Sequence, residues 1–172
     1  MKYTKNVFLK NNQKCLLRNA VGDDAQEVLN IFLLTHEQTD FLASYKDETS
    51  FDTAFEKQFL AEKEHADREV YLCAVVDGRI VGTANVDSMG ENKVRHRAEL
   101  GIAVDRAFWG VGLGRALIAA CIECAKEAGY SQLELEVVSE NGNAIALYKR
   151  MGFIEFGRNP RGFRSRFRGW QE

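Results

Sequence analysis

The stretch AELGIAVDRAFWGVGLGRALIAACIECAKEAG, residues 98–129, indicates the fold class of this chain. Its first part, AELGIAV (98–104), predicts a strand. A helix is predicted over 113–128, because apolar residues recur there at helical spacing and Gly129 is a typical stop signal. The apolar face of this helix consists of Leu113, Leu117, Ala120, Cys121, Cys124 and Ala128. A strand that leads through a short turn into a helix is typical of α/β proteins.

The turn between that strand and that helix is Trp109-Gly110-Val111-Gly112-Leu113-Gly114-Arg115. Its three glycines at alternate positions leave backbone N–H groups uncovered at a helix start, where the helix dipole adds positive charge. Such a turn predicts a phosphate or diphosphate ligand. It fits neither the G-x-G-x-x-G motif of dinucleotide-binding folds nor the G-K-[ST] ending of a nucleotide-triphosphate loop. A turn that merely packs tightly is the alternative interpretation.

The residues before this stretch predict a clear hairpin and a looser one. YLCAVV (71–76) and RIVGTANV (79–86) are joined by Asp77-Gly78, a strong signal for a tight hairpin turn. Short apolar runs at 7–9 and 14–18 predict a strand or a loose hairpin nearer the N-terminus. Because antiparallel hairpins precede the strand and helix at 98–129, the sheet is expected to be mixed.

Two helices are predicted between these hairpins. Asp23 is expected to cap the first helix, with Gln26 as its capping-box partner. The apolar face of that helix is Ala25, Val28, Leu29, Phe32 and Leu33. The second helix is expected to start after Ser50, where Phe51, Phe55 and Phe59 recur every fourth residue and share one stripe. Residues 37–49 are expected to form a loop or a short helical turn.

The residues after 129 continue the alternation of strands and helices. LELEVV (133–138) predicts a strand, and Asn141 is expected to cap a short helix that ends at Gly152. The inner face of this helix is Ala144, Leu147, Tyr148 and Met151. FIEFG (153–157) predicts a further strand.

Together, these motifs resemble the GCN5-related N-acetyltransferase (GNAT) superfamily. The resemblance rests on a strand, an x-G-x-G turn, a helix and a strand, followed by N-x-x-A-x-x-L-Y-x-x-x-G-F from Asn141 to Phe153. It covers about residues 97–157 closely. It implies an α/β fold, a single N-acetyltransferase domain over 1–172 with a mixed, mostly antiparallel sheet. A central splayed parallel pair and about four flanking helices complete the expected fold.

The resemblance also implies acetyl-CoA as the acetyl donor, with no metal. Its pantetheine would run along strand 98–104 and its diphosphate would sit on the glycine turn. Asn141 would touch the pantetheine or phosphate arm. The expected cofactor-binding residues are Ile102, Ala103, Val104, Gly110, Val111, Gly112, Leu113, Gly114, Arg115, Asn141, Ala144 and Tyr148. A non-catalytic acyl-CoA-binding domain that uses the same cradle is the alternative function. A protein that binds a different nucleotide phosphate, such as ATP or NAD, is the third.

The expected chemistry is direct attack of an amine on a thioester. Tyr148 would lie near the thioester sulfur and protonate the leaving thiolate, since a phenol stays protonated at neutral pH. A carboxylate would take the proton of the amine, directly or through water. Glu136 is slightly favoured over Glu99, because it lies nearer the splayed end that should hold the acceptor. A solvated strand carboxylate is an equally good interpretation of each.

Composition excludes several classes of protein. The chain has 172 residues, 45% apolar and 28% charged, with a net charge of −2, so it has no overall basic field for nucleic acid. The N-terminus lacks the apolar core of a signal peptide, and no apolar run is long enough to span a membrane. A cytoplasmic protein is expected. Four cysteines, Cys15, Cys73, Cys121 and Cys124, are expected to be buried apolar residues rather than metal ligands.

The acceptor is expected to be a small-molecule or peptide amine. Residues 36–49 and 87–95 should recognise it, and Asp40, Asp47 and Glu48 could attract a cationic amine. A solvated loop is the alternative interpretation of these residues, and the favoured one. The resemblance also implies that this chain could form a homodimer.

The chain departs from the family pattern at two places. Trp109 replaces the Gln or Arg that usually opens the turn. The chain stops at Glu172, before the further strand that the family normally has, so residues 160–172 are expected to be truncated or poorly ordered. Five arginines lie there: Arg158, Arg161, Arg164, Arg166 and Arg168. They are interpreted as a solvated hairpin or as contacts to a CoA phosphate or an acidic partner.

Overall fold

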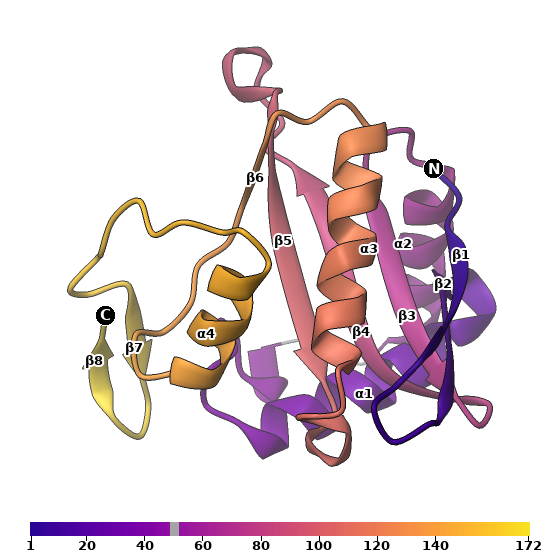
Figure 1. Ribbon diagram of the computed structural model, residues 1–172, viewed down its shortest axis with the longest axis horizontal. Helices are drawn as coiled ribbons and strands as arrows, with labels where there is room; N and C mark the ends of the chain where they lie inside the picture. The colour runs from indigo at the N-terminus through magenta and orange to yellow at the C-terminus, as the bar shows by residue number, and fades with distance from the viewer. Residues whose placement is uncertain (49–51) are drawn as a thin grey trace.

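The computed structural model describes residues 1–48 and 52–172 (Figure 1). Its main sheet has six strands in the order β1-β2-β3-β4-β5-β6. All neighbours are antiparallel except β5 and β6, which are parallel. The strands are β1 (Thr4–Phe8), β2 (Lys14–Asn19), β3 (Val70–Val76), β4 (Arg79–Ser88), β5 (Arg97–Val104) and β6 (Gln132–Glu134). The predicted mixed α/β class is confirmed, with the parallel pair at one end of the sheet rather than at its centre.

Four α-helices flank this sheet in the described residues: α1 (Ala25–Gln38), α2 (Thr53–His65), α3 (Leu113–Glu127) and α4 (Gly142–Arg150). Helix α3 packs on β3, β4 and β5, while α1 packs on β4 and α2 on β3. Figure 1 shows α3 in front of the sheet and α1 and α2 behind it. A separate two-stranded sheet, β7 (Phe163–Ser165) and β8 (Gly169–Gln171), lies beyond α4.

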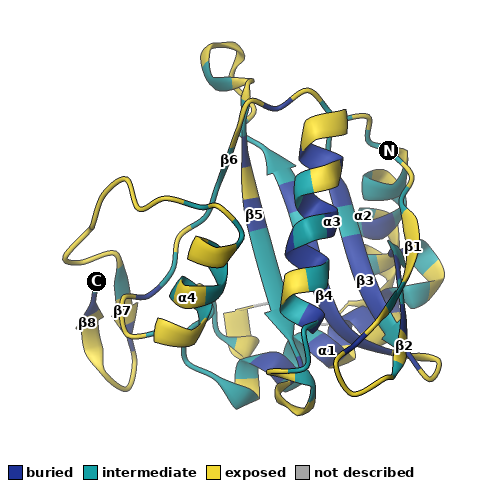
Figure 2. Cartoon of the chain, in the orientation of Figure 1, coloured by how far each residue is buried: buried dark blue, intermediate teal, exposed yellow. Residues whose placement is uncertain are grey.

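Two apolar clusters fill the layers on either side of the sheet. The cluster under α3 includes Leu113, Leu117 and Ile118, all fully buried, and the other joins α1 and α2 to the sheet around Val28 and Leu60. Figure 2 shows the buried residues concentrated on the inner side of α3 and on the strands beneath it. The predicted apolar face of α3 therefore forms the core, as helical periodicity requires. The predicted face of α1 is confirmed only in its first half, because Phe32 and Leu33 are half-buried while Ile31 and Thr35 are buried instead.

All four cysteines are free and buried. Burial raises the pKa of Cys124 to about 11 and that of Cys73 to about 12. Cys121 and Cys15 have raised pKa values for the same reason. Their thiols are therefore protonated at neutral pH and behave as small apolar side chains, as predicted.

Local signals placed most of the element boundaries correctly. The β3–β4 turn has Asp77 at φ 50° and Gly78 at φ 78°, the left-handed pair that a tight hairpin with the twist of its strands requires. Gly129 at φ 77° and Gly152 at φ 95° follow the ends of α3 and α4. Asn141 caps α4, because its Oδ1 accepts the Ala144 N–H at 3.3 Å.

The predicted start of α1 is wrong by one residue. Asp24, not Asp23, accepts the Val21 N–H at 2.8 Å, while Asp23 is exposed and pairs with Lys57. Burial raises the pKa of Asp24, but hydrogen bonds from Arg18 and Val21 outweigh it and leave that pKa below its ordinary value. The Arg18 guanidinium reaches both Asp24 oxygens, at 2.6 and 2.8 Å.

The phenylalanine stripe predicted for the second helix holds only in part. Phe59 packs edge-on against Tyr71, whereas Phe55 is 64% exposed. Phe51 lies outside the described residues. Asp52 caps α2 by accepting the Ala54 and Phe55 N–H groups.

Two predicted strands differ in the structure. Pairing of β6 with β5 ends at Glu134, so residues 135–138 are not part of the sheet. FIEFG (153–157) forms no strand, and its Ile154 and Phe156 are 85% and 79% exposed. A segment forms a strand only where its backbone groups pair with a neighbouring strand, and residues 153–157 pair with no strand in the described part of the chain.

The C-terminal segment also differs from its prediction. Residues 160–172, expected to be truncated or poorly ordered, contain the β7–β8 hairpin instead. Ser165 and Gln171 of this hairpin are buried. Within the described ranges, no helix combines the length and apolar character that crossing a membrane requires.

Candidate active site

The parallel strands β5 and β6 separate at the centre of the candidate site. The last paired residues are Glu99 and Glu134. On the other edge of β5, Asp105 donates its N–H to Val81 of β4 at 3.0 Å. Because peptide groups alternate in direction along a strand, those of Val104 and Ile102 point away from β4. They face the opening that β6 leaves.

Ala103 differs from its two neighbours. It lies in register with Thr83 of β4, and the same alternation turns its peptide groups towards that strand. The Val104 carbonyl already accepts a hydrogen bond from the Trp109 indole at 2.8 Å. Trp109, which replaces the usual Gln or Arg, therefore ties the glycine turn to the end of β5.

The glycine turn presents bare backbone at the start of α3. Gly110 and Gly112 have φ values of 77° and 94°, in the left-handed region that favours glycine. Gly112 is the N-cap residue of α3, and no side chain caps the helix there. The first N–H groups of a helix have no partner within the helix, so they are free to bind an anion.

Two further residues shape this turn. A Cβ on Gly114 would lie 3.2 Å from Leu147 of α4, so glycine there permits the close approach of α3 to α4. The Leu113 side chain is fully buried in the core, while Arg115 is exposed in the first turn of the helix. The turn is thus anchored on one side and open on the other.

Lys10 joins this site, although the sequence analysis missed it. Its N–H donates to the Val111 carbonyl at 2.9 Å, and its Cγ would lie 3.8 Å from a Cβ on Gly112. Lys10 is exposed, and among the described residues its ammonium has no ion-pair partner. No sequence signal could have placed it there, because the β1–β2 turn is about a hundred residues away along the chain.

Tyr148 lies on the half-buried face of α4, edge-on to Phe153 at 5.9 Å between ring centroids. Burial raises the pKa of Tyr148 above its ordinary value of 10. Its hydroxyl has no hydrogen-bond partner in the part of the chain that the structure describes. The phenol is therefore protonated at neutral pH and free to donate its proton.

The two candidate bases occupy different settings. Glu136 is exposed in the segment that follows β6. Glu99 is exposed on β5, in register with Asp87 of β4 and Glu134 of β6. Hydrogen bonds from Arg97 hold the pKa of Glu134 below its ordinary value. Glu134 is thus ion-paired with Arg97, whereas Glu136 and Glu99 have no ion pair among the described residues.

Asn85 on β4 makes a close contact with β5 that the sequence analysis did not predict. It lies in register with Gly101, where a Cβ would collide with the Asn85 amide. Its Nδ2 donates to Asp87 at 2.5 Å, and Asp87 also binds Lys63 at 2.7 Å. A glycine in β5 could have signalled a close approach of this kind.

The acidic residues expected to attract an amine are bound by this chain's own side chains. Both Asp47 oxygens accept from Arg166 at 2.7 Å, and Glu48 pairs with Arg166 at 3.5 Å. Asp40 accepts the Ser165 hydroxyl at 2.6 Å. We call this arrangement of residues 40–48 against 163–171 the clasp. The expectation that these three carboxylates are open to a cationic amine is therefore wrong.

Aromatic contacts reinforce the clasp. The Arg166 guanidinium lies 4.0 Å above the Tyr45 ring, and the Arg166 N–H donates to the Tyr45 hydroxyl at 2.7 Å. Arg168 lies over Phe41 at 5.4 Å and pairs with Glu140 at 2.9 Å. The arginine-rich segment thus meets an acidic partner within its own chain.

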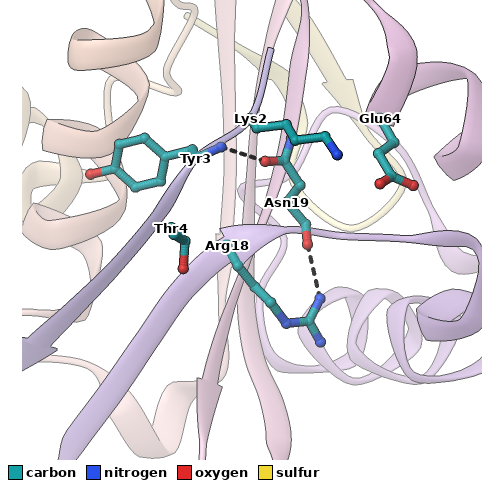
Figure 3. Close-up of a pocket in the computed structure, with 6 residues that line it drawn as sticks. All are labelled: Lys2, Tyr3, Thr4, Arg18, Asn19 and Glu64. Atoms are coloured by element: carbon teal, nitrogen blue, oxygen red, sulfur yellow. Dashed lines mark hydrogen bonds between the residues drawn. The ribbon is translucent and has the colours of Figure 1, made fainter.

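A hollow of about 280 Å³ lies at the β1 edge of the sheet, away from this site (Figure 3). Lys2, Tyr3, Thr4, Arg18, Asn19 and Glu64 line it. Asn19 accepts the Tyr3 N–H at 2.7 Å, and its carbonyl accepts from Arg18 at 2.8 Å. The Tyr3 ring points away from the other residues (Figure 3) and binds Glu123 instead. These groups hold the start of β1 in place.

Comparison with protein families gives a match over most of the chain. A family model described as "Acetyltransferase (GNAT) family" matches residues 30–153. The chain is similar to a solved acetyltransferase of the GNAT family from Streptococcus pneumoniae. Their TM-score is 0.86 at 28% identity, over 91% of this chain and 94% of the other.

Curated relatives match in sequence as well. The chain is 32% identical to an uncharacterized N-acetyltransferase of Methanocaldococcus jannaschii, over 81% of this chain and 60% of that protein. It is 35% identical to the L-amino acid N-acetyltransferase of Escherichia coli, over 48% of this chain and 51% of that protein. The matches span between about a quarter and three fifths of the length of the first curated relatives.

Proposed function

The chain belongs to the acetyltransferase (GNAT) family, and we propose that it transfers the acetyl group of acetyl-CoA to a primary amine. The observation that carries this proposal is the glycine turn at the start of α3. Gly112 begins that helix at φ 94° without a side-chain cap. Uncovered N–H groups at a helix N-terminus favour a phosphate ligand, and the diphosphate of coenzyme A has that chemistry.

The residues around the turn fit coenzyme A. The N–H groups from Gly110 to Arg115 would bind its diphosphate, with the exposed Arg115 adding positive charge. The outward peptide groups of Ile102 and the outward N–H of Val104 would pair with the pantetheine arm, as an added strand does, while the Val104 carbonyl stays with Trp109. A Cβ at Gly110 or Gly112 would impose strain, because both residues have positive φ values. Acetyl-CoA supplies the reactive thioester when bound.

Proton movement is assigned to α4 and to the segment after β6. The Tyr148 phenol, kept protonated by its raised pKa, would donate a proton to the thiolate that leaves. Glu136 would accept the proton of the attacking amine, directly or through water. Glu99 is the other carboxylate available for that role. Holding the two reactants together would supply much of the rate.

A screen for acceptors tests this function. Release of free thiol from acetyl-CoA would be followed with amino acids, peptides, polyamines and aminoglycosides as acceptors. We expect turnover with at least one primary amine, and mass spectrometry should find the added acetyl group on that amine. Tight binding of coenzyme A without turnover on any amine class would contradict an enzyme and favour a binding domain.

A further inference from the structure

Two arginines of the clasp each bind an aromatic ring and a carboxylate at once. Arg166 lies 4.0 Å above the Tyr45 ring, and its guanidinium also donates to both Asp47 oxygens at 2.7 Å. Arg168 repeats this arrangement, with an aromatic ring at 5.4 Å and a carboxylate at 2.9 Å. A guanidinium favours this combination, because its flat face stacks on a ring while its edge donates hydrogen bonds to a carboxylate.

Two other arginines of residues 158–168 have the ring but not the carboxylate. Arg161 and Arg164 lie 5.5 and 5.3 Å from the centre of the Trp170 ring, within the range of a cation–π contact. Among the described residues, neither forms an ion pair, whereas the other three arginines of this segment each form at least one. Two guanidiniums are therefore held in place on a ring with their charge uncompensated.

These three side chains face outward from the β7–β8 hairpin. Arg164 and Trp170 are direct partners in the register of the two strands, and both are exposed, Trp170 by 54%. Ser165 and Gln171, the next residues along each strand, are buried on the opposite side. Arg161 is exposed in the turn before β7. We call Arg161, Arg164 and Trp170 the arginine–tryptophan face.

The composition of this face favours a protein as its partner. Tryptophan and arginine are enriched among the residues that dominate binding energy in protein interfaces. Residues 153–172 contain five arginines and no lysine. The stacked arginines of the clasp bind carboxylates, so the same group is the natural complement of the two that remain. The hairpin lies at the edge of the molecule, beyond α4, where a partner can reach it (Figure 1).

We infer that the arginine–tryptophan face binds an acidic segment of another protein. Two aspartate or glutamate side chains of that segment bind Arg161 and Arg164, each through charge-assisted hydrogen bonds. The exposed indole of Trp170 packs against the segment between them. This docking surface is separate from the proposed acetyl transfer and does not depend on it.

NMR spectroscopy of the whole chain tests the inference with an eight-residue glutamate peptide whose ends are acetylated and amidated, so that it offers no amine. The chain has two tryptophans, so loss of one indole N–H signal in Trp170→Phe assigns both. We expect the peptide to shift the Trp170 signal but not the Trp109 signal, with a dissociation constant below about 1 mM at low salt. The matching glutamine peptide should shift neither signal. No shift with the glutamate peptide, or an equal shift with the glutamine peptide, would overturn the inference.

Two further measurements identify other occupants. An eight-nucleotide uridine RNA should bind more weakly than the glutamate peptide, and equal or tighter binding of the RNA would overturn the inference in favour of a nucleic acid. Light scattering of the protein alone should find no self-association through this face. A dimer that dissociates on Arg164→Gln would overturn the inference by showing that a second copy of the chain occupies it.

Substitution of single arginines tests the assignment to this face. Arg164→Gln and Arg161→Gln should each weaken binding of the glutamate peptide about fivefold at low salt, the scale of one exposed charge contact. Arg79→Gln is the matched control, because Arg79 is exposed at the start of β4 and has no ion pair among the described residues. It should leave the dissociation constant unchanged. Equal weakening by all three substitutions would overturn the inference, since net charge alone would then explain the binding.

Discussion

The two sides of the candidate site are built in different ways. The side proposed to bind coenzyme A consists mainly of backbone groups from one continuous stretch, from Ile102 to Arg115, with glycines at positive φ and no side-chain cap at the start of α3. The side proposed to face the acceptor consists of side chains that meet across the fold, as in the Ser165–Asp40 and Arg166–Asp47 contacts, whose partners are 125 and 119 residues apart. Substitutions should therefore act on the first side through conformation and charge at a few glycines, and on the second through individual contacts.

The largest expected effect is on the coenzyme side. Gly112→Asp would place a carboxylate where the diphosphate is expected, at a residue with φ 94°. We expect coenzyme A affinity to fall by at least about 100-fold, because a like charge replaces an open helix N-terminus. Isothermal titration calorimetry with coenzyme A would measure the loss.

Gly129→Asp is the matched control for that substitution. Gly129 follows the other end of α3 at φ 77°, so an aspartate there meets similar backbone strain. Its coenzyme A affinity should stay at the wild-type value. A similar loss in both variants would mean that strain, rather than the diphosphate cradle, explains the result.

The next effect separates binding from chemistry. Tyr148→Phe removes a hydroxyl without a partner in the described chain, so the fold should tolerate it. We expect kcat to fall by about 100-fold or more, the usual contribution of a general acid, while coenzyme A affinity stays unchanged. Tyr130→Phe is its control, because the Tyr130 hydroxyl, which is buried, also has no hydrogen-bond partner among the described residues. Equal kcat in both variants would remove Tyr148 from the mechanism.

The same tyrosine predicts a pH dependence. Burial raises the pKa of Tyr148, so the phenol remains the protonated acid at a higher pH than a free tyrosine would. Its contribution to kcat should therefore stay constant from neutral pH up to about 9. It should be lost only as the pH rises through the raised pKa. A wild-type kcat profile whose decline near neutral pH disappears in Tyr148→Phe would contradict this assignment.

Sequence alone predicted the local backbone of the glycine turn and its neighbours better than the contacts of the clasp, for a physical reason. The glycine turn, the N-cap at Asn141 and the β3–β4 hairpin depend on local backbone preferences, which residue types a few positions apart encode. The prediction of a strand at FIEFG (153–157) was wrong, because a strand also needs a neighbour with which its backbone groups pair. The contact of Lys10 with the glycine turn and the contacts of the clasp could not be predicted for a related reason. Their partners lie about a hundred residues away along the chain.

On the acceptor side, the two candidate bases allow a sharper comparison. Glu136→Gln should lower kcat/KM by about tenfold to 100-fold if Glu136 takes the amine proton. Glu99→Gln should have little effect, because Glu99 lies on the paired part of β5. Both are exposed carboxylates, so neither substitution should disturb the fold. The reverse order of effects would assign the base to Glu99, and two small effects would indicate water.

A smaller effect is expected from the clasp itself. Hydrogen bonds from Arg166 lower the pKa of Asp47. As the pH falls, Asp47 therefore stays charged and paired with Arg166 through the ordinary carboxyl range, and the pair is lost only at a lower pH. At low salt, Arg166→Ala should raise the KM for the acceptor modestly. It should not change the KM for acetyl-CoA. The difference should shrink at high salt, because exposed ion pairs are screened. A salt-independent rise would mean that stacking on Tyr45 holds the clasp instead.

The smallest effect is expected on the proposed coenzyme side. There Lys10 would add a side-chain charge to a site made mainly of backbone groups. Its exposed side chain starts beside the glycine turn, because the Lys10 N–H donates to the Val111 carbonyl and its Cγ would lie 3.8 Å from a Cβ on Gly112. Lys10→Ala should weaken coenzyme A binding about two- to fivefold, the scale of one exposed charge contact, and more at low salt than at high salt. Lys14→Ala removes an equally exposed lysine at the start of β2 and should change nothing. If Lys10→Ala also left the affinity unchanged, backbone groups and Arg115 would account for the whole coenzyme side.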